Sequence, residues 1–333
     1  MTPQHDTEGP RAADSLLDKL RGILLPFPTP FTAADELDLA ALGANLARWH
    51  ETGVTGYVAL GSTGERVHLD EREYAAVIEA ARAAVPASHL LVAGAGQQSL
   101  RHTHTEAQRA AEAGADALLV ITPHFYRRAM THAALVDYYA AVADRTPVPV
   151  LLYSMPELTG VALAPETVAE LARHPNIVGV KDSSGDILNF AETLRLAPPG
   201  FAVLTGNGPL LYAALTAGAT GAILAAGCAA PRLAVAIFAA VAAGEHARAV
   251  RLQQAFTPLA RAVTVRYGIG GLKAALDLAG YAGGPVRAPL RAPTAEARAE
   301  IAQLLRAALR YTAGDDASDK DEAAASLSAG ANL

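Results

Sequence analysis

The sequence predicts an α/β fold, a (β/α)8 TIM barrel with a C-terminal helical extension, from two observations. Eight short apolar runs alternate with amphipathic stretches of helical spacing between residues 22 and 224. These runs lack strict alternation of polar and apolar residues, which is typical of parallel strands covered on both faces. The first run leads into Pro26-Phe27-Pro28-Thr29-Pro30, unlike the glycine-rich turn that a dinucleotide-binding sheet needs. A barrel is therefore favoured over a doubly wound sheet.

The expected strands are the apolar runs themselves, at Gly22–Pro26, Gly56–Leu60, Leu90–Ala93, Ala117–Ile121, Val148–Tyr153, Ile177–Lys181, Ala202–Thr205 and Gly221–Leu224. Helices are expected between them, for example at Leu39–Glu51, Glu71–Ala84, Thr103–Ala113 and Ala133–Ala143. The predicted organisation is a disordered polar tail over 1–14, the barrel over 15–231, the eighth helix and extension over 232–311, and a disordered acidic tail over 312–333.

Composition excludes several classes of partner. The net charge is −6 without a long basic run, which argues against nucleic acid or an anionic membrane surface. The single cysteine, Cys228, excludes an internal disulfide and fits a reducing cytoplasm. The uncharged stretch Leu210–Ala230 is too weakly apolar for a membrane span, and the first 14 residues lack the apolar segment of a signal peptide. The sequence thus predicts a cytoplasmic protein outside the membrane.

Lys181 is the candidate nucleophile, because it ends the apolar run Ile177-Val178-Gly179-Val180 and is the only lysine between Arg21 and Leu272. Burying an ammonium without a partner costs roughly several kcal/mol, so such a group tends to give up its proton. A neutral amine in an apolar pocket is a nucleophile toward carbonyl carbon. The alternative is a lysine that reaches past the strand end to solvent or to Asp182.

Two other strand ends carry functional groups. The second run leads into Gly61-Ser62-Thr63-Gly64-Glu65, whose hydroxyls and backbone N–H groups suit a carboxylate, or which is a plain glycine-rich turn before a helix. The fifth run ends at Tyr153, whose phenol either transfers protons or packs with its hydroxyl in water. Because a barrel gathers its strand ends at one mouth, these groups are expected to meet Lys181.

Together the three strand ends fit carbonyl chemistry on a small-molecule 2-oxo acid. Lys181 would attack the ketone and form an iminium, whose nitrogen accepts electrons when the C3–C4 bond breaks or forms. Tyr153 would move protons, and Ser62 and Thr63 would hold the carboxylate.

No cofactor beyond this covalent imine is expected, and no metal. The ten histidines are scattered along the chain. His102 and Glu106 would share a helix face, but two ligands make a poor site.

The sequence resembles the pyruvate-dependent class I aldolases, the family of dihydrodipicolinate synthase and N-acetylneuraminate lyase, over about residues 20–310. The shared motifs are Gly61-Ser62-Thr63-Gly64-Glu65, Thr122-Pro123, Tyr153 with Pro156 and Gly160, and Gly179-Val180-Lys181-Asp182 with Ser184-Gly185-Asp186. The resemblance implies Lys181 as the Schiff-base lysine and Tyr153 as the proton-transferring phenol. It implies Ser62 and Thr63 as the carboxylate-binding pair, with Ser62 in a proton relay, and Ile223 as a residue whose backbone carbonyl faces bound pyruvate. It also implies a homo-oligomer, usually a tetramer built from tight dimers.

Departures from the family patterns bear on the substrate. Leu158 stands where dihydrodipicolinate synthases carry an arginine for a substrate carboxylate, which is not a conservative change. Phe125 stands where they carry a relay tyrosine from a neighbouring subunit, and the adjacent Tyr126 would point elsewhere. Gly206-Asn207-Gly208-Pro209 stands where neuraminate lyases carry an acidic residue.

The closest resemblance is to the 4-hydroxy-2-oxoglutarate aldolases of the same family. It rests on Tyr153-Ser154-Met155-Pro156, His174-Pro175-Asn176-Ile177-Val178-Gly179, Tyr267-Gly268-Ile269-Gly270-Gly271-Leu272-Lys273, and Gly283-Gly284-Pro285 followed by Arg287-Ala288-Pro289-Leu290. Thr63 departs from the asparagine of the animal members. That reaction releases pyruvate and glyoxylate, and its second carboxylate needs a cation. Arg127 is the candidate, its alternative being a surface arginine at a subunit contact.

The expected function is therefore cleavage of 4-hydroxy-2-oxoglutarate by a Schiff-base lyase. Three alternatives stay open. They are condensation of pyruvate with aspartate semialdehyde by a dihydrodipicolinate synthase (4-hydroxy-tetrahydrodipicolinate synthase), cleavage of a 2-keto-3-deoxy or neuraminate sugar acid, and non-catalytic binding of a 2-oxo acid on the same fold.

Overall fold

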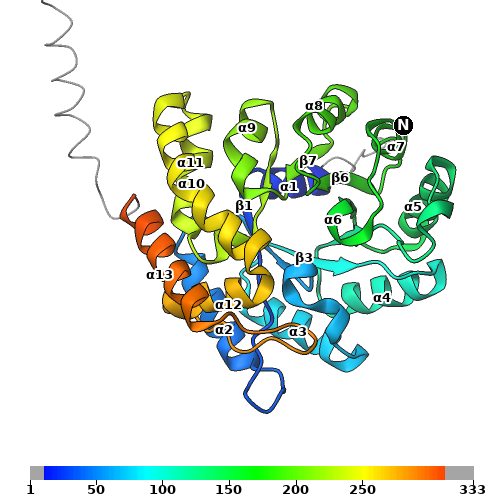
Figure 1. The fold of residues 1–333 in the computed structure, drawn as a ribbon. Coiled ribbons are helices and arrows are strands. Elements are labelled where there is room, and N and C mark those ends of the chain that lie inside the picture. The colour runs from blue at the N-terminus through cyan, green and yellow to red at the C-terminus, as the bar shows by residue number, and fades with distance from the viewer. Residues whose placement is uncertain (1–10, 312–333) are drawn as a thin grey trace, which may run out of the picture.

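The structure, a computed structural model, describes residues 11–311 and contains the predicted closed barrel of eight parallel strands. The strands follow one another around the barrel in chain order, and β8 closes it by pairing with β1 (Figure 1). They are β1 (Ile23–Pro26), β2 (Gly56–Ala59), β3 (Leu90–Ala95), β4 (Ala117–Ile121), β5 (Val150–Ser154), β6 (Ile177–Asp182), β7 (Ala202–Thr205) and β8 (Gly221–Ile223).

The barrel helices form an outer ring around the strands (Figure 1). They are α2 (Leu39–His50), α3 (Glu71–Ala84), α4 (Leu100–Glu112), α5 (His132–Arg145), α7 (Pro165–Leu171), α8 (Ile187–Leu196), α9 (Leu211–Thr216) and α10 (Pro231–Ala242). Local chemistry fixes several of their starts. Asp70 and Glu73 form a reciprocal capping box at α3, and the side chains of Ser99 and Asp186 cap α4 and α8.

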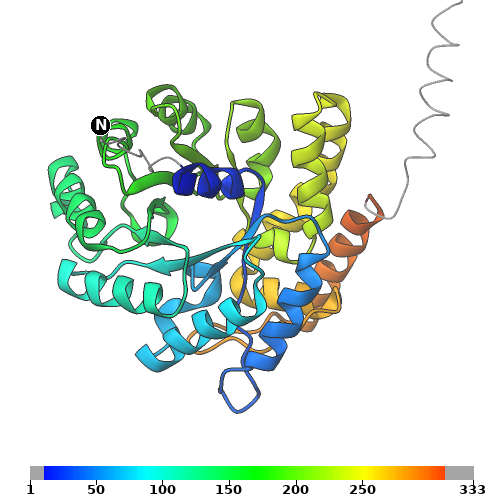
Figure 2. The ribbon, with the colours of Figure 1, turned by 180° about the vertical axis from the view of Figure 1, so that it is seen from behind.

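Apolar side chains form two cores because strand residues alternate between the barrel interior and the helix layer. In β2, Val58 belongs to the interior cluster, whereas its neighbour Tyr57 packs in the outer one. The helix α1 (Arg11–Leu20) adds Leu16 and Leu20 to the interior cluster, and it crosses in front of the strands in Figure 2. The interior therefore is a packed core, closed by α1, and not a pore.

The N-terminal boundary differs from the prediction. The expected tail over 1–14 is wrong for residues 11–14, because α1 begins at Arg11. The sequence of this polar amphipathic segment does not reveal the helix, because the apolar partners of Leu16 and Leu20 lie in distant strands. The remainder of that tail, 1–10, and the expected tail 312–333 lie outside the described residues.

The C-terminal extension is helical, as expected, and lies beside α2 (Figure 1). It comprises α11 (His246–Arg261), a π-helical turn η6 (Ala262–Arg266), α12 (Gly268–Leu278) and α13 (Ala295–Arg310). All residues of α12 from Gly270 to Leu276 are buried. Asn45 of α2 exchanges two 2.8 Å hydrogen bonds with the backbone of Ala282, which ties the extension to the barrel. Within residues 11–311, no helix combines the length and apolarity needed to cross a membrane.

Candidate active site

The carboxyl ends of β5 and β6 bring Tyr153 and Lys181 side by side. The two residues are partners in the parallel register of these strands. They are 4% and 5% exposed, and the Nζ of Lys181 lies 4.4 Å from the centroid of the Tyr153 ring. The strands thus place an amine against a phenol at the barrel face where enzymes of this fold carry their chemistry.

Lys181 takes neither of the alternative positions considered from the sequence. It is buried rather than extended to solvent, and in the described part of the chain no carboxylate forms an ion pair with it. The carboxylate of Asp182 instead accepts a hydrogen bond from the N–H of Ser184 at 2.7 Å. Successive strand residues face opposite sides, which separates the two side chains. An amine with no ion pair is available to a carbonyl carbon.

Ser62 reaches the same site from a short 3₁₀ turn, η1 (Ser62–Gly64), which follows β2 and also contains Thr63. The Oγ of Ser62 lies 3.4 Å from the phenolic oxygen of Tyr153, and Thr63 is buried. The hydroxyl of Thr29 donates to the carbonyl of Gly64 at 2.7 Å and holds the turn against the first strand's loop. The Ser62–Tyr153 contact is long for a hydrogen bond between hydroxyls, and such contacts tighten when a substrate binds.

Ile223 and Arg127 lie at different depths. Ile223 ends β8 and is fully buried in the interior cluster that also contains Tyr153. Arg127 begins the short turn η3 (Arg127–Ala129) after β4 and is exposed. Its side chain lies over Gly160, where the nearest Arg127 atoms would be 3.0 Å from an added Cβ. The structure therefore brings Arg127 to the rim of the mouth and not into the buried cluster.

The two positions at which the sequence departs from the dihydrodipicolinate synthase pattern, Leu158 and Phe125, carry exposed apolar side chains. Leu158 lies in the short helix α6 (Pro156–Thr159) directly before Gly160 and is exposed. Phe125 and Tyr126 are exposed as well, with their rings in an edge-on contact at 5.1 Å. The rim thus combines the cationic side chains of Arg127 and Arg128 with exposed apolar side chains.

Two further residues border Lys181 and were not singled out from the sequence. A Cβ added at Gly206 would lie 1.9 Å from the Oγ of Ser183 and 2.8 Å from the Cε of Lys181. Both side chains therefore pass directly over Gly206, a position that only glycine leaves open. The period of two along a strand already places Lys181 and Ser183 on one face. Their proximity to Gly206 depends on the pairing of β6 with β7.

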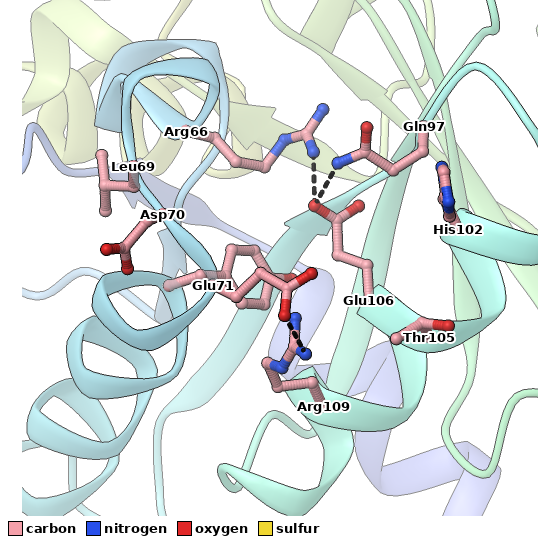
Figure 3. Close-up of a pocket in the computed structure, with 10 residues that line it drawn as sticks. Arg66, Leu69, Asp70, Glu71, Gln97, His102, Thr105, Glu106 and Arg109 are labelled. Carbon is pink, nitrogen blue, oxygen red and sulfur yellow. Dashed lines mark hydrogen bonds and ion pairs between the residues drawn. The ribbon is translucent and has the colours of Figure 1, made fainter.

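A separate polar cavity of about 220 Å³ lies between α3 and α4 (Figure 3). Four of its charged side chains form pairs, because Arg66 and Gln97 donate to Glu106 at 2.6 and 2.9 Å and Arg109 pairs with Glu71 at 2.8 Å. Neither Lys181 nor Tyr153 lines it. Over residues 11–311, no group of three or more His, Cys, Asp or Glu side chains is arranged to hold a metal ion.

Comparisons with known proteins cover nearly the whole described chain. The model of the dihydrodipicolinate synthetase family matches residues 19–308. A 4-hydroxy-tetrahydrodipicolinate synthase of Methanosphaerula palustris is 35% identical over 287 residues, which cover 85% of this chain and 98% of that protein. The enzyme of the same name from an Exiguobacterium species is 34% identical over 280 residues, 84% of this chain and 95% of that protein. Among solved structures, the Escherichia coli K12 prophage protein YagE in complex with pyruvate matches with a TM-score of 0.80 and 31% identity, covering 86% of this chain and 97% of that chain.

Proposed function

The chain belongs to the dihydrodipicolinate synthetase family, and from that premise we propose that Lys181 forms a covalent imine with the ketone of a 2-oxo acid. As a family member the protein is an enzyme, a pyruvate-dependent class I aldolase that acts as a carbon–carbon lyase. The observation that carries the assignment of residues is the contact of a buried, unpaired lysine with a buried tyrosine at the mouth of the barrel.

The proposed reaction begins when the Nζ of Lys181 attacks C2 of pyruvate and the former carbonyl oxygen takes up a proton. Loss of water from this carbinolamine gives the iminium, and loss of a C3 proton then gives an enamine. The enamine attacks an aldehyde carbon, and hydrolysis of the new iminium releases product and frees Lys181. Cleavage is the same sequence in reverse, and the imine nitrogen accepts the electrons, so no further cofactor or metal is proposed.

Tyr153 and Ser62 are proposed to carry the protons of these steps. Their oxygens lie 3.4 Å apart, and Tyr153 is the group beside the amine that can both donate and accept. Ser62 and Thr63 are proposed to bind the substrate carboxylate through their hydroxyls and the N–H groups of η1. The backbone carbonyl of Ile223 is proposed to face the bound pyruvate, which is consistent with its position in the barrel interior.

Condensation of pyruvate with aspartate semialdehyde is the first candidate for the overall reaction. The curated relatives at 34–35% identity bear the name of that synthase, so they support this alternative better than the cleavage of 4-hydroxy-2-oxoglutarate expected from the sequence. The expectation from the sequence rested on Leu158, Phe125 and a few short shared segments such as Tyr267–Lys273, whereas the relatives match over most of the chain.

Cleavage of 4-hydroxy-2-oxoglutarate is retained as a second candidate because of the rim. Leu158 offers no cation where the synthases of this family are expected to bind a second carboxylate. Arg127 supplies a cation nearby, since its side chain lies over Gly160 at the end of α6. No ion pair within residues 11–311 involves Arg127. A guanidinium at this position can bind the distal carboxylate of a dicarboxylic 2-oxo acid in a bidentate geometry.

The partners proposed for the chain are its small-molecule substrate and further copies of itself. The exposed pair Phe125 and Tyr126 supports assembly into a homo-oligomer, since exposed aromatic side chains are typical of subunit contacts. A cytoplasmic location remains a prediction from the single buried cysteine, Cys228.

Reductive trapping tests the chemistry, and product assays then separate the candidates. Treatment with pyruvate and cyanoborohydride is expected to add a stable mass to the peptide that contains Lys181, and absence of the adduct would refute the imine. Purified protein is then given pyruvate with aspartate semialdehyde, or 4-hydroxy-2-oxoglutarate alone. Arg127→Ala is expected to raise KM only for the second substrate if that cleavage is the reaction.

A further inference from the structure

Glu65 directly follows the turn that presents Ser62 and Thr63, and its carboxylate is buried by residues from the far end of the chain. The side chain of Glu65 is 0% exposed, and its Oε1 lies 2.6 Å from the Nζ of Lys273 in α12. Its Oε2 accepts the backbone N–H of Arg287 at 3.0 Å, a contact across 222 positions of sequence. His68, in the next turn, lies 3.2 Å from the same oxygen. The end of the turn is therefore attached to the C-terminal extension.

Lys273 is itself fixed by the extension. Its side chain is 1% exposed, its Nζ donates to the carbonyl of Pro285 at 2.7 Å, and the ammonium lies 4.3 Å from the centroid of the Phe31 ring. A Cβ added at Gly283 would approach the carbonyl oxygen of Lys273 to 2.1 Å, so this backbone packs on α12 without intervening space. The ammonium that meets Glu65 thus has little freedom to move.

The backbone of Glu65 needs such an anchor. Its φ of 55° and ψ of 31° lie in the left-handed region, which residues with side chains seldom adopt. Residues persist there when their surroundings determine the conformation. The contacts of the two carboxylate oxygens fix the conformation of Glu65, because a rotation of its backbone would withdraw the carboxylate from Lys273 and Arg287.

We propose that Glu65 and Lys273 are positioning residues, through which the C-terminal extension holds the Ser62–Gly64 turn in the geometry that binds a substrate carboxylate. The proposal rests on the proposed function, since it assumes that a 2-oxo acid carboxylate binds at this turn. Removal of Lys273 would leave a buried carboxylate without its counter-charge. Glu65 would then leave its site and move the turn, and with it the groups that meet the substrate carboxylate.

The test compares pyruvate with acetone, which has a methyl group in place of the carboxylate. The variants are Lys273→Met, the neutral pair Glu65→Gln/Lys273→Met, and the control Glu73→Gln. Glu73 belongs to the same charged cluster through Arg287, at 2.5 Å, but it lies in α3 and does not touch the turn. Trapping of each carbonyl compound on Lys181 with cyanoborohydride is followed by intact mass as a function of its concentration.

Lys273→Met is expected to raise the half-saturating pyruvate concentration by about 10²-fold, the loss that a small misplacement of a binding group produces. In the same variant, the half-saturating acetone concentration is expected to stay within about threefold of that of the parent protein. The half-saturating pyruvate concentration of Glu73→Gln is expected to stay within the same range. The neutral double variant is expected to bind pyruvate weakly as well. It removes the buried charge, but it also lacks the ion pair that anchors the turn. It also keeps the test available if the single variant does not fold.

Three results would overturn the proposal. They are an unchanged pyruvate value in Lys273→Met that is folded by circular dichroism, equal changes for pyruvate and acetone, and full recovery of pyruvate binding in the double variant. Absence of any adduct in the wild-type protein would instead refute the proposed imine at Lys181. The two failures are therefore distinct.

Discussion

Lys181 and Lys273 are both buried beneath an aromatic ring, yet their surroundings differ in one decisive respect. Their ammonium nitrogens lie 4.4 and 4.3 Å from the ring centroids of Tyr153 and Phe31. Lys273 has a carboxylate at 2.6 Å and a carbonyl at 2.7 Å. For Lys181 no carboxylate partner occurs within residues 11–311. Burial alone therefore does not distinguish a reactive lysine from a structural one, whereas the counter-charge does.

The charge on Lys273 is balanced within a fixed network. Burial lowers the pKa of Lys273, and the carboxylate of Glu65 opposes that effect. The ion pair with Glu65 and the hydrogen bond to Pro285 occupy the amine, so it is not available to a carbonyl compound. The comparison predicts that loss of Lys181 removes the chemistry, whereas loss of Lys273 lowers stability and weakens pyruvate binding.

Lys181→Met should have the largest effect. Activity is expected to fall by on the order of 10⁴-fold or more, since loss of a covalent nucleophile costs that much or more in other enzymes. Pyruvate with cyanoborohydride should leave no adduct on this variant, while Lys273→Met at high pyruvate should still form one. An unchanged adduct in Lys181→Met would mean that another amine is the nucleophile. Urea unfolding should show the variant to be about as stable as the parent, because no ion pair is broken.

Lys273→Met should instead reduce the free energy of unfolding, by about 3–5 kcal/mol, because it leaves the carboxylate of Glu65 buried without its partner. Glu65→Gln/Lys273→Met should recover most of this loss, since it removes both charges at similar volume. The measurement is the urea midpoint of each protein. A double variant no more stable than the single one would show that packing, and not charge, dominates this contact.

Tyr153→Phe should preserve the amine but remove its proton carrier. Turnover is expected to fall by about 10²–10⁴-fold, the range for loss of general acid–base help, while trapping of pyruvate on Lys181 persists at a slower rate. Tyr74→Phe is the matched control, because Tyr74 of α3 is equally buried but donates its hydroxyl proton to the carbonyl of Gly94. Equal activity losses in the two variants would contradict the role of Tyr153.

Acid should weaken the ion pair between Glu73 and Arg287. The hydrogen bond from Arg287 holds the pKa of Glu73 below its usual 4.5. A folded-state pKa below the unfolded value contributes stability that is present above pH 4.5 and is lost as the pH falls through the folded value. Between pH 7 and acid pH, Glu73→Gln should therefore lose less unfolding free energy than the parent protein, by about 1 kcal/mol or less. Urea midpoints of both proteins at the two pH values measure this difference. An identical acid loss in both proteins would contradict this assignment.

Local pattern predicted most of the fold because the forces that set it are local. The bounds of β4 and β7 coincide with the expected runs, and α3 has the expected bounds Glu71–Ala84. In contrast, a polar tail and a polar amphipathic helix have similar amino-acid compositions. The start of α1 at Arg11 was missed because its helix is supported by contacts with the barrel interior.

The candidate site was predictable only in part. Lys181, Tyr153 and the Ser62–Gly64 turn each end a strand, and a barrel gathers strand ends, so the sequence could bring them together. Gly206 depends on which strand lies beside β6, and no local pattern reports that. The roles of all these residues, and of Ile223 and Arg127, remain predictions that the experiments above test.

The sequence by itself determined the class of fold, the family and the existence of a lysine where an apolar strand ends. Alternating apolar runs, capping residues and motif spacing express short-range preferences that survive without knowledge of distant neighbours. Only the tertiary structure decided that Lys273 has a counter-charge in Glu65 while Lys181 has none among residues 11–311. Coulombic interaction depends on distance in space, and it is the folded chain that brings a carboxylate after β2 to an ammonium in α12.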